Sequence, residues 1–190
     1  MLLSIDTSSS VCLLSLGQAG TFHYRISEES CSHSQVLLML IQELLSEAHI
    51  QLKDLSGIAV VNGPGSFVGV RLGVSVAQGL AYALGSLVWP LSGLQILAQS
   101  ALRKFIFRDA HMGEMYTGEY ECDAKAIMRP LRPDAIEALI PDKLSTSNFL
   151  ASPKALHQIA WEQFSTTPGL KPEALAPLYL KGANLWKATK

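Results

Sequence analysis

A continuous apolar segment followed by a glycine-rich turn constrains the fold of this chain more than any other feature. Residues 57–62, GIAVVN, lack the alternation of a half-exposed strand, which predicts a strand buried on both faces in the middle of a sheet. The next residues, GPGSFVGVRLG, hold glycines at 63, 65, 69 and 73. A helix is expected to follow at about residues 68–84 and to end at Gly85. The sequence therefore predicts a strand–turn–helix unit of an α/β fold.

Elements of the same kind flank this unit. In the first half, strands are expected at residues 2–5, 11–16, 21–26 and 87–91, and a helix at 34–48. Ser32 and Gln35 fit a capping box at the start of that helix. In the second half, strands are expected at 105–107, 115–121, 124–128 and 143–146, and helices at 135–139 and 155–164. Because both halves open as strand, Asp-containing turn, strand, strand and helix, the sequence predicts two ribonuclease-H-like units.

The predicted fold class is therefore α/β, with two actin-like or ribonuclease-H-like (ASKHA) subdomains whose mixed sheets are flanked by helices. The boundary is expected near residues 93–103, which gives an N-terminal subdomain over 1–97 and a C-terminal subdomain over 98–190. At 190 residues the chain is one medium domain or two small ones.

Composition narrows the range of functions. The chain is 48% apolar and 16% charged, as expected of a globular protein. Its net charge of −1 disfavours a protein that grips nucleic acid by itself. The N-terminus has no basic region and reaches Asp6 at once, and the longest apolar run, residues 36–41, is far shorter than the ~18 residues that span a bilayer. Three widely spaced cysteines, Cys12, Cys31 and Cys122, fit free thiols, so a cytoplasmic protein is expected.

The glycine-rich turn fails the tests for the common phosphate and hydrolase motifs. Val70 stands where a Walker loop needs lysine, Val68 where a dinucleotide fingerprint needs glycine, and Pro64 where a hydrolase elbow needs glycine. Two interpretations stay open. Gly63 and Gly65 allow a sharp bend that Pro64 stiffens, or the amides at the helix start bind an anion or nucleotide together with Ser66 and Arg71.

Small residues recur every four positions along the helix that follows: Gly69, Gly73, Ala77 and Ala81. A glycine inside a helix costs roughly 0.5–1 kcal/mol relative to alanine, so a close approach of another segment is expected to compensate. That segment is either the sheet of the same chain or a helix of a second chain.

The helix at 34–48 raises the same question. Val36 and Met39 fall within its polar face and Leu38 lies at the border of that face. Contiguous exposed apolar residues mark partner sites. This face is therefore covered either by a partner or by a loop of the same chain.

No catalytic set is apparent. The five histidines, at 23, 33, 49, 111 and 157, include no pair with helical spacing for a metal. Asp6 and Asp109 each follow an apolar strand, where kinase-like folds keep carboxylates, but neither precedes a glycine-rich hairpin. Cys12 is expected in the core. No metal site is predicted.

Several segments together resemble the bacterial TsaB (YeaZ) family: LLSIDTSSS, HSQVLLMLIQELL, VNGPGSFVGVRLGVSVAQGLA, RDAHMGEMY and PLYLK. The core GPGSF-x-G-x-R-x-G is the specific part. The resemblance is strong over residues 1–97 and patchy after 120. The family usually has Thr at the position of Val68 and Arg at those of His111 and Lys181, and lysine lacks the planar fork of arginine.

The resemblance implies two actin-like subdomains, the second one shortened here, that have lost their own active site. It implies a non-catalytic subunit that binds and activates a metal-holding TsaD-type catalytic subunit as a heterodimer. With a TsaE-type ATPase, that pair places a threonylcarbamoyl group on the adenosine next to the anticodon of certain tRNAs. No tightly bound cofactor is expected, and ATP or ADP is expected only at the partner interface. The chain is expected to contact tRNA only through the complex and to form a homodimer when it is alone. No association with a membrane is expected.

In the family the pairing surface maps onto the helices at 34–48 and 68–84. The residues expected to bind the partner are Val36, Leu37, Met39, Leu40, Gly69, Gly73, Val76, Ala77 and Leu80, and those of the anion-contacting loop are Gly63, Gly65, Ser66 and Arg71. Two alternatives stay open. One is an autonomous actin-like ATPase or phosphotransferase using Asp6, Asp109 and the loop amides; the other is a metalloprotease, which the histidine spacing hardly supports.

Overall fold

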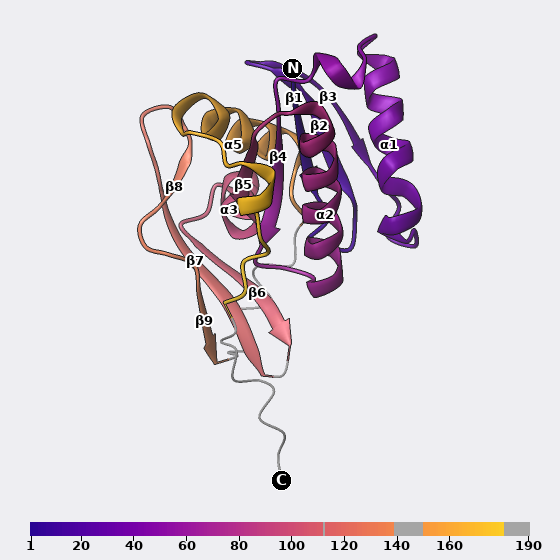
Figure 1. Ribbon diagram of the computed structural model, residues 1–190. Helices are drawn as coiled ribbons and strands as arrows, with labels where there is room; N and C mark the ends of the chain where they lie inside the picture. The colour runs from indigo at the N-terminus through magenta and orange to yellow at the C-terminus, as the bar shows by residue number, and fades with distance from the viewer. Residues whose placement is uncertain (112, 139–149, 181–190) are drawn as a thin grey trace.

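A computed structural model describes residues 1–111, 113–138 and 150–180. Within them, five strands form a mixed sheet in the order β3-β2-β1-β4-β5, and a smaller antiparallel sheet has the order β6-β7-β8, with β9 also paired to β7 (Figure 1). The first sheet contains β1 (Leu2–Asp6), β2 (Leu13–Gln18), β3 (Thr21–Ile26), β4 (Gly57–Gly63) and β5 (Val88–Ser92). The second contains β6 (Phe105–His111), β7 (Glu114–Cys122), β8 (Met128–Pro130) and β9 (Ala135–Ala138).

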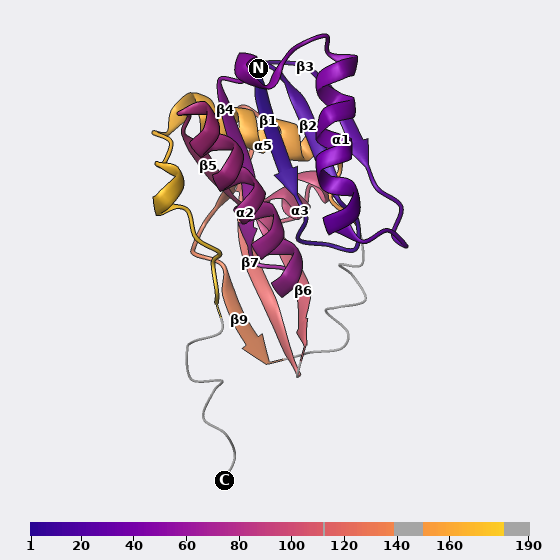
Figure 2. The ribbon, with the colours of Figure 1, turned by 45° about the vertical axis from the view of Figure 1, so that its right-hand side comes forward.

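Helices cover both faces of the first sheet, as the α/β prediction requires. The helices are α1 (His33–Glu47), α2 (Phe67–Leu84), α3 (Gly93–Ala101) and α5 (Pro153–Thr166), and short 3-10 turns occupy Leu52–Asp54 and Pro172–Ala174. Helices α1 and α2 lie side by side on one face, with α5 behind the sheet (Figure 2). Successive residues of β4 alternate between the two cores: Ile58 packs with α1 and α2, and Ala59 with α5. The prediction of a strand buried on both faces is confirmed.

Helix α3, which connects the two sheets, was not predicted. Leu94, Leu97 and Ala98 pack against Ile106 and other buried residues of the second sheet. The boundary expected between residues 97 and 98 falls inside this helix, while α5, from the second half, packs on the first sheet. The division into subdomains over 1–97 and 98–190 stays a prediction.

Three local predictions are wrong. Residues 135–138 form strand β9 rather than a helix, because they pair with β7 and gain their hydrogen bonds across the sheet. Ser32 precedes α1 without capping it, since its hydroxyl lies 2.9 Å from the hydroxyl of Ser34. The strand expected at 143–146 lies outside the described residues. The strand expected at 124–128 starts only at Met128, because the Asp123 carboxylate accepts the amides of Lys125 and Ile127 and closes a turn there.

Residues 167–180, the C-terminal strap, run back along β5 and α2 (Figure 2). Leu170 exchanges both backbone hydrogen bonds with Val88, at 2.9 and 2.8 Å. The Gln78 side chain donates to the carbonyls of Pro172 and Leu175 at 3.0 and 2.9 Å. The Leu178 amide then donates to the Asn62 carbonyl at 2.7 Å. The strap therefore pairs with the edge strand β5 and lies along the flank of α2.

His157 of α5 ties this helix to the hairpin between β2 and β3. Its Nε2 lies 2.8 Å from the carbonyl oxygen of Gln18, so Nε2 carries the proton and donates it, and its ring stacks on Phe22 at 4.5 Å between centroids. Nδ1 is buried without a hydrogen-bond partner among the described residues. Burial lowers the pKa of His157 below its ordinary value of 6.5.

This burial predicts a loss of stability in acid. Below about pH 6.5 the unfolded chain gains a proton at residue 157 that the folded chain resists, so the free energy of unfolding falls as the pH falls from 6.5 toward the lower folded pKa. Well above pH 6.5, where residue 157 is neutral in both states, this group contributes no pH dependence. His157→Gln keeps a donor for Gln18 and should flatten the curve between pH 7 and 5 in urea titrations. Equal slopes in the wild type and His157→Gln would contradict the prediction.

Candidate functional site

The three parallel strands β1, β4 and β5 end at one edge of the first sheet, next to β6. In α/β sheets, ligands bind in the crevice outside the carboxyl ends of the strands. Here the segments at that edge are 6–8 after β1, 63–66 after β4, and Ser92 with Gly93 after β5. A Cβ on Gly93 would lie 2.9 Å from the Pro64 carbonyl oxygen and 3.3 Å from the Ser8 hydroxyl. The three segments are thus packed together at this edge.

Arg108 of β6 reaches this edge of the first sheet. Its Nη2 donates to the carbonyl oxygen of Ser8 at 2.6 Å, and its Nη1 lies 3.4 Å from the Ser8 hydroxyl. The Ser66 amide donates to the same carbonyl at 2.8 Å. Burial lowers the pKa of Arg108 and the nearby charge of Asp6 raises it, and an arginine stays protonated in either case. The Arg108 guanidinium, a cation of the chain itself, therefore joins this edge of the first sheet to β6 of the second sheet.

The glycine-rich turn is shaped by close approaches within the chain. Gly63 has φ of +134° and a cis peptide bond to Pro64, and a Cβ there would lie 2.7 Å from the carbonyl oxygen of Leu178. A Cβ on Gly65 would lie 2.6 Å from the Cβ of Ser8. The Ser66 hydroxyl caps α2 by accepting the Gly69 amide at 3.2 Å. The interpretation of these glycines as a bend is confirmed, and anion binding by this loop stays a prediction.

Arg71, predicted to contact an anion, is engaged by aromatic rings. Its guanidinium carbon lies 3.6 Å from the centroid of the Phe67 ring, and its Nε donates to the Tyr179 hydroxyl at 2.7 Å. The Phe67 and Tyr179 rings lie 5.8 Å apart. The cation at the start of α2 is therefore held against the end of the C-terminal strap.

The two carboxylates of the ATPase alternative, Asp6 and Asp109, lie in different surroundings. Asp6 is buried and its Oδ1 accepts the Ser8 amide at 2.8 Å, while Asp109 is exposed on β6. Burial raises the pKa of the Cys12 thiol to about 12, in keeping with its predicted place in the core. Across residues 1–111, 113–138 and 150–180, no group of three or more His, Cys, Asp or Glu side chains is placed to hold a metal ion.

The small-residue ridge of α2 faces its own sheet, so the first of its two interpretations is confirmed. A Cβ on Gly69 would overlap the carbonyl oxygen of Thr7, and one on Gly73 would overlap the Thr7 hydroxyl, which itself donates to the Gly69 carbonyl at 2.7 Å. Helix α2 is long and apolar enough to span a bilayer by length and composition alone, but in this fold its ridge is packed on β1 and β4.

Five residues predicted to bind a partner are buried: Leu37, Leu40, Gly69, Gly73 and Ala77. They do not line the surface of the chain in this structure, and their contact with a partner stays a prediction. Of the other four, Met39 is exposed, and Val36, Val76 and Leu80 are partly buried at the edge of the core.

The outer sides of α1 and α2 carry exposed apolar residues, which we call the helical face: Leu38 and Met39 of α1, and Phe67, Val68 and Tyr82 of α2. Leu38 is 61% exposed, Val68 74% and Tyr82 79%. The acidic side of α1 turns toward β3, where Arg25 contacts Glu43 and Glu47 at 3.2 and 2.6 Å. Phe67, Val68 and Tyr82 were not predicted to lie on this face. Their positions opposite the ridge on the helix were the available signal.

The fold and this edge of the first sheet together define the class of protein. It is an α/β protein of the actin-like or ribonuclease-H-like type in which Arg108 of β6 bonds to the segment after β1. A family model described as TsaD, tRNA N6-adenosine threonylcarbamoyltransferase, matches residues 27–165. The solved structure of YeaZ from Pseudomonas aeruginosa superposes with a TM-score of 0.84 at 29% identity, covering 94% of this chain and 99% of that one. The chain belongs to the TsaB (YeaZ) family within this group.

Curated relatives carry the same family name. The TsaB protein of Escherichia coli strain K12, a tRNA threonylcarbamoyladenosine biosynthesis protein, is 34% identical over 71% of this chain, and the match spans 61% of its own length. TsaB of Haemophilus influenzae is 27% identical over 98% of this chain and 95% of its own. The predicted family and fold are confirmed.

Proposed function

We propose that this chain is the non-catalytic subunit of the complex that makes threonylcarbamoyladenosine next to the anticodon of tRNA, and that it binds and activates a TsaD-type catalytic subunit. The observation that carries the non-catalytic part is Arg108. Its bonds to Ser8 place a cation of the chain across the edge where this fold otherwise admits a ligand. Catalysis then belongs to the partner.

The helical face supports docking. Large apolar side chains lie exposed on both helices, Leu38 and Met39 on α1 and Val68 near the start of α2, and exposed apolar surface is typical of partner sites. The catalytic subunit named by the family model shares this fold family, so equivalent helix pairs can meet across a pseudo-twofold axis. Without the partner, the same face pairs with a second copy of this chain.

The remaining parts of the proposal follow from this role. The complex works in the cytoplasm with a TsaE-type ATPase, and ATP or ADP binds, if at all, at the interface of the two subunits. Because the net charge is −1, this chain reaches tRNA through its partner rather than by a basic surface of its own.

Reconstitution tests the proposal. The TsaD-type subunit, the TsaE-type ATPase, tRNA and the activated threonylcarbamoyl donor are mixed with and without this chain, and modified adenosine is measured by mass spectrometry of nucleosides. Modification is expected only when the chain and the catalytic subunit are both present. Modification without this chain would refute the activating role. Turnover of Mg-ATP by the isolated chain would favour the autonomous ATPase instead.

A further inference from the structure

Gly79 lies in the middle of α2 with nothing in its own chain to explain it. It is exposed, and apart from its chain neighbours and the nearby backbone of α2, a Cβ added to it would meet no described atom within 4 Å. Gly69 and Gly73 of the same helix are explained by Thr7, which leaves no room for a side chain. Glycine is the poorest helix former after proline. An exposed helical glycine with open space above it therefore carries a cost that this fold does not require.

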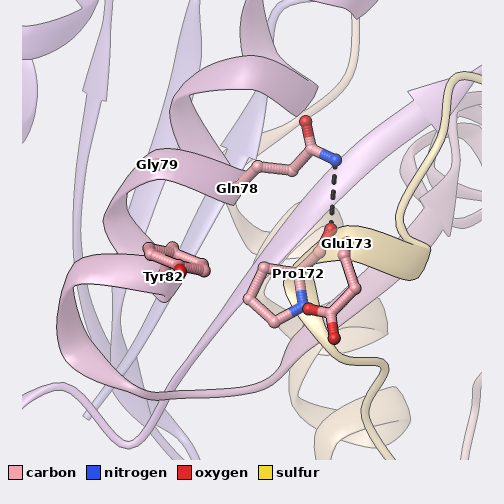
Figure 3. A pocket seen from close by; sticks show the side chains of 5 residues that line it. All are labelled: Gln78, Gly79, Tyr82, Pro172 and Glu173. Carbon is pink, nitrogen blue, oxygen red and sulfur yellow. Dashed lines mark hydrogen bonds between the residues drawn. The ribbon is translucent and has the colours of Figure 1, made fainter.

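Gly79 is part of a hollow of about 300 Å³ between α2 and the C-terminal strap, which we call the Gly79 pocket (Figure 3). Gln78 and Tyr82 line it from the helix, and Pro172 and Glu173 from the strap. The Gln78 side chain donates to the Pro172 carbonyl, so the two walls are joined by a hydrogen bond. The bare backbone of Gly79 keeps the pocket open, and a side chain at that position would fill part of it.

The pocket opens on the outward stripe of α2. Val68, Arg71, Ser75, Gly79 and Tyr82 follow one another at intervals of three or four residues and are all exposed. The pocket is thus continuous with the helical face through this stripe. The Tyr82 side chain lines the Gly79 pocket and also belongs to the helical face.

We propose that the Gly79 pocket receives one apolar side chain of leucine or methionine size from a helix of the catalytic partner. This inference rests on the proposed function and specifies its docking surface. The Tyr82 ring, the Pro172 ring and bare backbone favour an apolar group, and a bare position on a helix lets a facing helix approach closely. Glu173 at the strap side favours a lysine or arginine beside that apolar side chain.

The test separates binding from stability. Gly79→Ala should raise the melting temperature of the isolated chain by about 2–4 °C, because alanine favours the helix and nothing obstructs its methyl group. The same variant should bind the TsaD-type subunit several-fold more weakly in calorimetry. Gly79→Leu should fill the pocket and weaken binding at least tenfold. A residue with only a structural role would not raise stability and lower affinity together.

Ser165→Leu is the matched control, since it places the same side chain on an exposed position of α5, on the other face of the sheet, and should leave affinity unchanged. If wild type binds and both Gly79 variants bind equally well, the pocket proposal is overturned while the proposed function stands. If wild type itself does not bind, the proposed function fails and the pocket proposal with it. Should Gly79→Leu fail to fold, Gly79→Ala alone decides.

Discussion

Gly69→Ala is expected to destabilise the fold by about 3 kcal/mol, at the upper end of the range for overpacked positions. A single methyl group at residue 69 would overlap the carbonyl oxygen of Thr7, which is backbone and cannot rotate away. The shift would also disturb the bond from the Thr7 hydroxyl to the Gly69 carbonyl and the capping of α2 by Ser66. Urea unfolding followed by circular dichroism measures the change.

Gly79→Ala is the internal control, because it makes the same substitution in the same helix where space is open. It should stabilise the chain by up to about 1 kcal/mol. Two identical substitutions ten residues apart are thus expected to have opposite signs. A stabilising or neutral effect at Gly69 would show that α2 does not sit on the loop after β1 as described.

The packing partner of the small-residue ridge of α2 could not be predicted from the sequence. Four-residue spacing of Gly69, Gly73, Ala77 and Ala81 predicts a close approach but not which segment makes it, because a sheet and a second helix accept the same bare surface equally well. The deciding contact is with Thr7, 62 residues earlier in the chain. No local pattern encodes such a pairing. The two surface helices were placed correctly from the sequence, and Met39, predicted to lie within the polar face of the first, is exposed.

Helix α3 was missed for a different reason. Gln95 and Gln99 are polar but buried, so they interrupt the apolar periodicity by which a helix is recognised. Their amides are satisfied by the backbone near β8: Gln95 donates to the Met128 carbonyl at 2.8 Å, and the Gln99 oxygen accepts the Met128 amide at 2.8 Å. Burial of these side chains depends on a strand 30 residues later. The C-terminal strap escaped prediction similarly, since its bonds to Asn62 and Gln78 span about a hundred residues.

The second large effect is expected at the edge where β1 ends, where Arg108 of β6 bonds to Ser8. Arg108→Met keeps the length of the side chain and removes its donors, so the Ser8 carbonyl keeps only the Ser66 amide. Hydrogen bonds that involve a charged group contribute about 1.5–3 kcal/mol, and the buried Asp6 carboxylate also loses a nearby positive charge. A loss of about 2–3 kcal/mol in the free energy of unfolding is therefore expected.

Two comparisons decide whether that loss arises from the bridge. Arg132→Met removes an exposed ion pair with Glu119, at 3.2 Å, and should change stability by less than about 0.5 kcal/mol. Hydrogen exchange should accelerate in Arg108→Met at the Ser66 amide and along β6, because both are held to Ser8 through the same carbonyl. Equal stabilities of the two arginine variants, with unchanged exchange at Ser66, would mean that the sheets are held together without Arg108. Arg108 would then not carry the non-catalytic part of the proposed function.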